Sequence, residues 1–107
     1  MNLNEELLPS VKGTLGVTWE HRDKDILDMI DEGIAFLESR ASPLYFSFDD
    51  KNNVARSSRK LLKEYCRYAW AGTAAYFEND YRSDILNLQI TAASFERSRP
   101  KNETKSL

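Results

Sequence analysis

The scarcity of chain-breaking residues constrains this chain most. Its 107 residues include only four glycines and three prolines. Pro9, Gly13 and Gly16 lie together near the N-terminus, and Pro43 lies before the middle, so the remaining stretches are long and almost uninterrupted. Apolar residues recur in those stretches at spacings of three and four, which is the period of an α-helix. The sequence therefore predicts an all-α fold.

We expect four or five helices in a bundle-like domain. The first contains Pro9, which suits the first turn of a helix, so this helix either begins near Leu8 or Pro9 or bends there. Gly16 is a suitable residue to end it. In the middle of the second helix, Gly33 either permits the close approach of another helix, as a glycine there usually does, or is simply tolerated at its cost of about 1 kcal/mol. The expected bounds of the helices are 4–15, 23–40, 54–79 and 82–95.

A long aromatic loop is expected between the second and third helices. It contains Tyr45, Phe46 and Phe48, which favour a strand, but nothing else in the chain has strand character that would pair with one. We therefore expect a loop whose aromatic side chains pack either on the core or on a neighbouring subunit. Residues 1–96 are predicted to form one domain, and residues 97–107 a flexible polar tail.

Few residue types suited to catalysis are present. The chain has one histidine and one cysteine, and phosphate-binding glycine motifs are missing. Cys66 lies among apolar positions, which predicts a small buried residue, and His21 is expected on the surface of a linker. No catalytic, cofactor-binding or metal-binding residue is predicted, no cofactor is expected, and we expect a protein that is not an enzyme.

Two charged surfaces are candidates for contacts. Asp28, Asp31 and Glu32 share a face of the second helix; they suit a solvated surface, although paired carboxylates also hold metals or transfer protons. A basic ridge on the third helix consists of Arg56, Arg59, Lys60, Lys63 and Arg67. This ridge suits a solvated face, salt bridges to an acidic neighbouring subunit, or phosphate contacts with nucleic acid.

Aromatic side chains are unusually frequent on the expected third helix. Tyr65, Tyr68, Trp70, Tyr76 and Phe77 fall on several of its sides. A helix that is apolar over most of its circumference is buried on several sides. In so short a chain, this predicts that a second copy covers one of them. The longest apolar runs are much shorter than the ~20 residues that cross a bilayer, so no membrane partner is expected, and the sequence shows no secretory signal, which indicates cytosolic synthesis.

Four segments together resemble the small head–tail connector proteins (adaptor, or DNA-packaging, proteins) of tailed phages and prophages. They are DILDMIDEGIAFL at 25–37, LLKEYCRYA at 61–69, AYFENDY at 75–81 and ILNLQ at 85–89. The resemblance covers residues 3–95 and consists of helical patterns.

The resemblance implies a virion structural protein and no active site. Members of the family have four or five helices and assemble as a ring of about a dozen copies beneath the portal, using heterologous contacts. They help to complete the DNA-filled head and to attach the tail. The implied partners are other copies, the portal, a tail-side connector or stopper, and DNA passing through the lumen. The implied location is the host bacterial cytoplasm during assembly and then the head–tail interface of the virion.

The candidate subunit-interface residues are the acidic face, the loop aromatics and the basic ridge. They are Asp28, Asp31, Glu32, Tyr45, Phe46, Phe48, Arg56, Arg59, Lys60, Lys63 and Arg67. The alternative function is a small helical regulatory module that binds DNA or a protein partner through its third helix. The first turns of that helix carry side chains typical of a recognition helix, namely Asn53, Arg56, Ser57 and Arg59.

Overall fold

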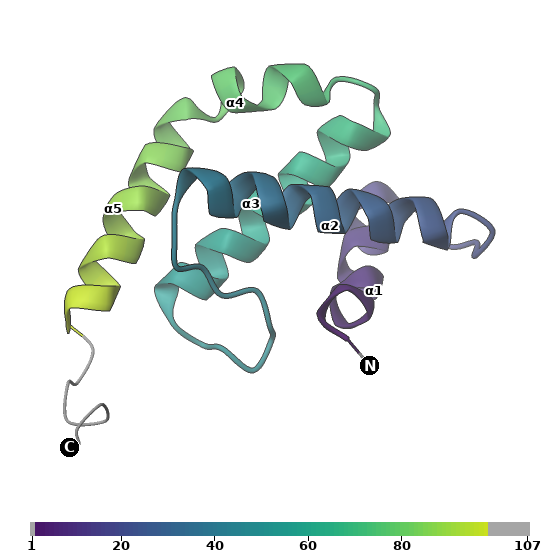
Figure 1. Ribbon diagram of the computed structural model, residues 1–107. Coiled ribbons are helices and arrows are strands. Elements are labelled where there is room, and N and C mark those ends of the chain that lie inside the picture. The colour runs from purple at the N-terminus through teal and green to yellow at the C-terminus, as the bar shows by residue number, and fades with distance from the viewer. Residues whose placement is uncertain (1, 99–107) are drawn as a thin grey trace.

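A computed structural model describes residues 2–98, and all regular secondary structure in that part of the chain is helical (Figure 1). The all-α prediction is therefore confirmed. The elements are α1 (Leu3–Leu15), α2 (Asp23–Arg40), α3 (Asn53–Trp70), a 3₁₀ turn (Ala74–Tyr76), α4 (Phe77–Asp80) and α5 (Arg82–Ser98).

The first helix begins earlier than Pro9. Asn2 and Glu5 form a reciprocal cap, in which the Glu5 amide donates to Asn2 Oδ1 (2.9 Å) and the Asn2 amide donates to Glu5 Oε1 (3.1 Å). This pair satisfies backbone groups that the first turn leaves without helical partners, so α1 starts at Leu3 and Pro9 lies inside it. Gly16 ends the helix at a φ of 74°, as expected.

The second helix has the predicted bounds, and Gly33 lies where α2 meets α3. A Cβ added to Gly33 would lie 2.6 Å from Leu62 Cδ1 and 2.9 Å from Tyr65 Cδ1. The expected close approach of another helix is therefore confirmed. Helices α1, α2 and α3 pack against one another, as Figure 1 shows, and Ile30 and Leu37 of α2 are fully buried in this core.

The third helix is shorter than predicted. The chain leaves the helix after Trp70, and Gly72 adopts a φ of 79° in the turn that follows. The Thr73 amide donates to the Tyr68 carbonyl (2.8 Å) and the Gly72 amide to the Ala69 carbonyl (3.0 Å), which is how a helix ends when a glycine takes the left-handed conformation. The single helix expected over 54–79 is thus wrong; the chain turns and continues as the 3₁₀ turn and α4.

This turn places Phe77 against the aromatic side of α3. Phe77 is fully buried, and its ring centre lies 5.4 Å from that of Tyr65 and 5.6 Å from that of Tyr68. It also contacts Phe36 (5.9 Å) and stacks on Tyr81 (4.7 Å). The chain therefore covers much of this aromatic surface itself, and a second copy is not required for it.

The last helix lies at the edge of the molecule. Ile85, Leu88 and Ala92 are buried, and α5 packs mainly on α3. It continues through Ser98, so the helical domain extends two residues past the predicted boundary at 96; the remainder of the predicted tail lies outside the described residues. The Cα atoms span only 17 Å in the thinnest direction, less than two helix diameters of about 10 Å.

Candidate assembly surfaces

The three acidic residues predicted on α2 lie on its exposed face. Asp28 Oδ2 lies 3.6 Å from Lys24 Nζ, and Asp31 Oδ1 accepts a long hydrogen bond from Asn4 Nδ2 (3.4 Å). Exposed contacts of this kind contribute little to stability. These residues are accessible to a partner. Their contacts are also those of a helix face that is exposed only to solvent.

The loop aromatics have three different environments. Phe46 is only 3% exposed and belongs to the core, so it cannot contact a neighbour while the subunit is folded. Tyr45 is half-buried, and its ring meets Phe95 edge to face (5.7 Å). Phe48 is 38% exposed. Of the two expected environments, the subunit core therefore applies to Phe46, and Phe48 is the loop aromatic that remains exposed.

Glu6 and Arg59 hold this loop from two sides. The Glu6 carboxylate accepts hydrogen bonds from Ser47 Oγ (3.0 Å) and from the Phe48 amide (2.7 Å). Arg59 Nη1 donates to the carbonyls of Ser47 (2.6 Å) and Asp50 (3.2 Å), and its guanidinium lies 5.2 Å from the centre of the Phe48 ring. Arg59 thus positions the loop of its own subunit. Glu6 was missed from the sequence because nothing there indicates its pairing with a loop 41 residues away.

The rest of the basic ridge is divided between internal contacts and free surface. Arg67 pairs with Glu64, and Arg56 donates to Asn53 Oδ1 (3.0 Å) while remaining exposed. Lys60 is exposed and Lys63 is half-buried. The part of the ridge that is open to a partner therefore lies near the N-terminal half of α3.

Glu64 connects this ridge to the aromatic cluster. Burial alone raises its pKa, but hydrogen bonds from Arg67 and from the Tyr81 hydroxyl (2.8 Å) outweigh that effect, so the pKa of Glu64 is lowered. The carboxylate is therefore held in its charged form. This arrangement stabilises the contact of α3 with the start of α5 and is a structural feature.

The outer face of α5 carries an apolar stripe that the sequence analysis missed. Leu86 is 53% exposed and Ile90 is 59% exposed, and exposed Ala93 follows at the next helical spacing. This stripe faces away from the buried residues of the same helix, which are Ile85, Leu88 and Ala92. A helix with a second apolar face has surface left to bury. The sequence does contain a signal for this stripe. Ile85 and Leu86 are both apolar, as are Leu88 and Ile90, but only one residue of each pair can lie on the inner face of the helix.

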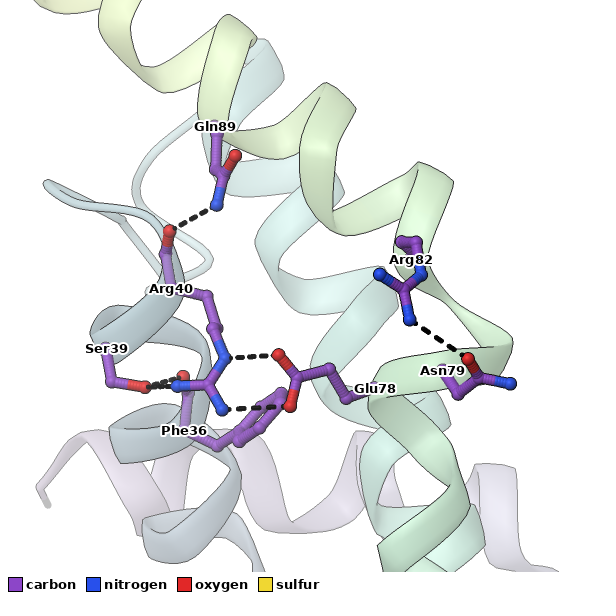
Figure 2. A network of polar contacts seen from close by, with 7 residues as sticks. All are labelled: Phe36, Ser39, Arg40, Glu78, Asn79, Arg82 and Gln89. Carbon is purple, nitrogen blue, oxygen red and sulfur yellow. Dashed lines mark hydrogen bonds and ion pairs between the residues drawn. The ribbon is translucent and has the colours of Figure 1, made fainter.

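A network of polar contacts lies beside this stripe, where α2 ends against α4 and α5 (Figure 2). Arg40 pairs in two-pronged fashion with Glu78, with Nε–Oε2 at 2.6 Å and Nη2–Oε1 at 2.9 Å. The hydrogen bond from Arg40 lowers the pKa of Glu78. Gln89 Nε2 donates to the Arg40 carbonyl (2.8 Å). The network therefore ties the C-terminal end of α2 to both later helices.

A surface hollow of about 420 Å³ opens at this network. Leu86 and Ile85 supply its apolar lining, and Arg82 and Gln89 supply polar groups. In Figure 2, Arg82 points toward Asn79, and it donates to the Asn79 amide oxygen (3.1 Å). The hollow thus joins an apolar edge to hydrogen-bonding groups, as recognition sites at interfaces do.

A second exposed aromatic residue, Trp19, lies in the loop before α2. It is 45% exposed and stacks on His21 with 6.0 Å between ring centres. Arg22 lies over the Trp70 ring (4.7 Å), which holds this loop on the end of α3. His21 is on the surface, as predicted.

Cys66 is buried in the core, as predicted. Burial, with a smaller contribution from Glu32, raises the pKa of the thiol to about 12. Within residues 2–98, no three or more His, Cys, Asp or Glu side chains are grouped so that they could hold a metal ion. No helix in that range has the length and apolar character needed to cross a membrane.

In comparisons with known proteins, no family model, curated protein or solved structure matched this chain.

Proposed function

We propose that this chain is a structural subunit of a tailed-phage or prophage particle, a head–tail connector that assembles as a ring under the portal. The observation that carries the proposal is the uncovered apolar stripe on α5, with Leu86 and Ile90 more than half exposed. The resemblance of residues 3–95 to connector proteins supports it. In this role the ring helps to complete the DNA-filled head and provides the attachment site for the tail.

The mechanism is binding, driven by burial of apolar surface. A subunit only 17 Å thick has a large surface for its volume, and exposed apolar side chains at helical spacing are typical of interaction sites. A ring needs two different surfaces on each subunit. The exposed acidic residues of α2 and the open part of the basic ridge add charges that favour one orientation of approach.

The proposed partners are further copies of the chain, the portal and a tail-side connector or stopper. DNA that passes through the lumen would meet a lining of cations such as Arg56 and Lys60. Contacts with phosphates are independent of base sequence and weaken as salt rises. Such contacts assist passage and do not require tight binding by the free subunit.

Sedimentation velocity over a wide range of protein concentration, followed by negative-stain microscopy with and without the portal protein from the same genome, tests the proposal. We expect closed rings at high concentration or on the portal. Compact monomers under all these conditions would contradict it. Tight, salt-dependent binding of duplex DNA by those monomers would support a regulatory module in its place.

A further inference from the structure

Two exposed apolar patches lie at opposite ends of α2. Trp19 lies in the loop that leads into the N-terminus of α2, whereas Arg40 at its C-terminus is bonded to Glu78 and Gln89 beside the α5 stripe. The helix has 18 residues and is therefore about 27 Å long. Figure 1 shows α5 and the loop before α2 on opposite sides of the molecule. One subunit cannot bring these patches together.

The α5 patch has the form of a ridge between two hollows. Leu86 borders the hollow of about 420 Å³ that Arg82 also lines, and Ile90 borders another of about 560 Å³ beside Phe95. A ridge of two branched side chains flanked by hollows offers apolar contact to a flat aromatic ring, with room for the ring edge. Polar groups at the border can accept a hydrogen bond from the indole N–H.

The Trp19 patch carries matching chemistry. Its indole is exposed and supported by His21. The adjacent Glu20 is exposed and forms no ion pair within residues 2–98. On the α5 side, Arg82 donates to the neutral amide of Asn79. The pKa of Glu78 is lowered mainly by the hydrogen bond from Arg40 and to a smaller extent by the charge of Arg82, so Arg82 lies near a carboxylate that Arg40 already binds. One patch thus has an aromatic ring beside a carboxylate, and the other has an apolar ridge beside a guanidinium. The two patches are complementary in shape and in charge.

We propose that the Trp19 end of one subunit docks on the α5 stripe of the next, with the indole against Leu86 and Glu20 near Arg82. The occupant of the stripe is a second copy of this chain, and the inference rests on the ring assembly proposed above. Because the two surfaces differ, the contact is head to tail and repeats from copy to copy, closing into a ring when the rotation permits.

Chemical cross-linking tests this pairing without altering the contact residues. Thr18→Cys places a thiol beside Trp19, and Ser83→Cys places one on the outer face of α5, one turn before Leu86; both positions are exposed. The native Cys66 is buried. Equimolar single variants, mixed and treated with a short bismaleimide, should give a covalent dimer, and each variant alone should give little. The double variant should give a ladder of multimers.

A substitution at the anchor provides the second measurement. Trp19→Ala in the Thr18→Cys chain should reduce the yield of mixed dimer, and weaken self-association, about tenfold or more, as loss of an aromatic anchor does. The matched control is Tyr76→Ala, which removes an exposed aromatic side chain that lines neither of the two hollows beside the α5 stripe and should leave the yield unchanged.

Three results would overturn the inference. Efficient dimerisation of Ser83→Cys alone would show that two α5 stripes pair with each other. Rings that form normally but give no mixed cross-link would refute this pairing while leaving the proposed function intact. Absence of self-association at any concentration, and on the portal, would refute both the pairing and the ring.

Discussion

Replacing Gly33 by alanine tests whether α2 and α3 approach as closely as the structure shows. The new Cβ would lie 2.6 Å from Leu62 Cδ1 and 2.9 Å from the Tyr65 ring, both shorter than van der Waals contact. Leu62 is fully buried and has little freedom to move, so overpacking should cost about 1–3 kcal/mol. Alanine favours a helix over glycine by about 1 kcal/mol. The net effect on the free energy of unfolding should therefore be a loss of about 0–2 kcal/mol.

Gly13 supplies the matched control. It also lies within a helix, but an added Cβ would meet nothing within 4 Å. Gly13→Ala should therefore stabilise the protein by about 0.5–1 kcal/mol from helix propensity alone. Both variants gain helix propensity, but only the methyl group at residue 33 is crowded by its neighbours. Their free energies of unfolding should therefore differ by about 1–3 kcal/mol. Urea unfolding followed by circular dichroism, with unchanged m-values, measures this difference.

Whether Gly33→Ala stabilises or destabilises the protein shows whether α2 and α3 approach closely at this position. If Gly33→Ala stabilises the protein as much as Gly13→Ala does, then α2 and α3 do not approach closely at Gly33. In thermal unfolding the same contrast should appear as a difference of about 4–8 °C for each kcal/mol in a domain of this size. A changed m-value for Gly33→Ala alone would instead indicate that packing of the native state has loosened.

Three further predictions follow from single side chains. Ser58 is fully buried and its Oγ has no hydrogen-bond partner among the described residues, so Ser58→Ala should stabilise the protein by about 1 kcal/mol in urea unfolding; a clear loss of stability would contradict this. With a thiol pKa of about 12, Cys66 should resist labelling by an aromatic disulfide at pH 8 and react promptly in urea, whereas fast labelling of the native protein would refute its burial. Hydrogen bonds from Arg67 and Tyr81 outweigh the opposing effect of burial and lower the pKa of Glu64 below its ordinary value of 4.5, so its contribution to stability is complete above that pH and is lost as pH falls toward the folded pKa. Unfolding measured from pH 6 to pH 3 should show a smaller decline in Glu64→Gln than in the parent chain, and equal slopes would exclude this role.

The second helix shows how much local sequence can predict. Its apolar residues recur with one period from Ile26 to Leu37, Arg40 suits the last turn, and Pro43 follows soon after. Each of these signals agrees with the others, and the structure gives the predicted bounds, 23–40. The expected start of α3 at residue 54 would make Asn53 its cap, whereas in the structure the side chain of Asn52 caps the helix by accepting from the Ala55 amide (2.8 Å). Only the path of the loop distinguishes the two asparagines.

The end of α3 could not be predicted from periodicity. Leu62, Cys66 and Phe77 fit one helical stripe, and this period runs past Gly72 without a break. In the structure the chain turns at Gly72 and returns Phe77 to the same core from a different element. The hydrophobic pattern records which side chains are buried together, and it does not record whether the backbone between them is a continuous helix. The single glycine was the local signal, and its positive φ accompanies the hydrogen bonds that the Gly72 and Thr73 amides donate to the last carbonyls of α3.

The interface residues are harder to predict because burial within a subunit and burial between subunits use the same side chains. Phe46 and Phe48 are two residues apart in one loop, yet one is in the core and the other is exposed. Helix α5 presents the same ambiguity on a larger scale, since a helix with two apolar faces suits the centre of a large protein as well as the edge of a small subunit. The structure shows that α5 is at the edge, where α3 covers only its inner face. The stripe at Leu86 and Ile90 is therefore not explained by packing within the subunit, and the contact that we propose with a second copy would explain it.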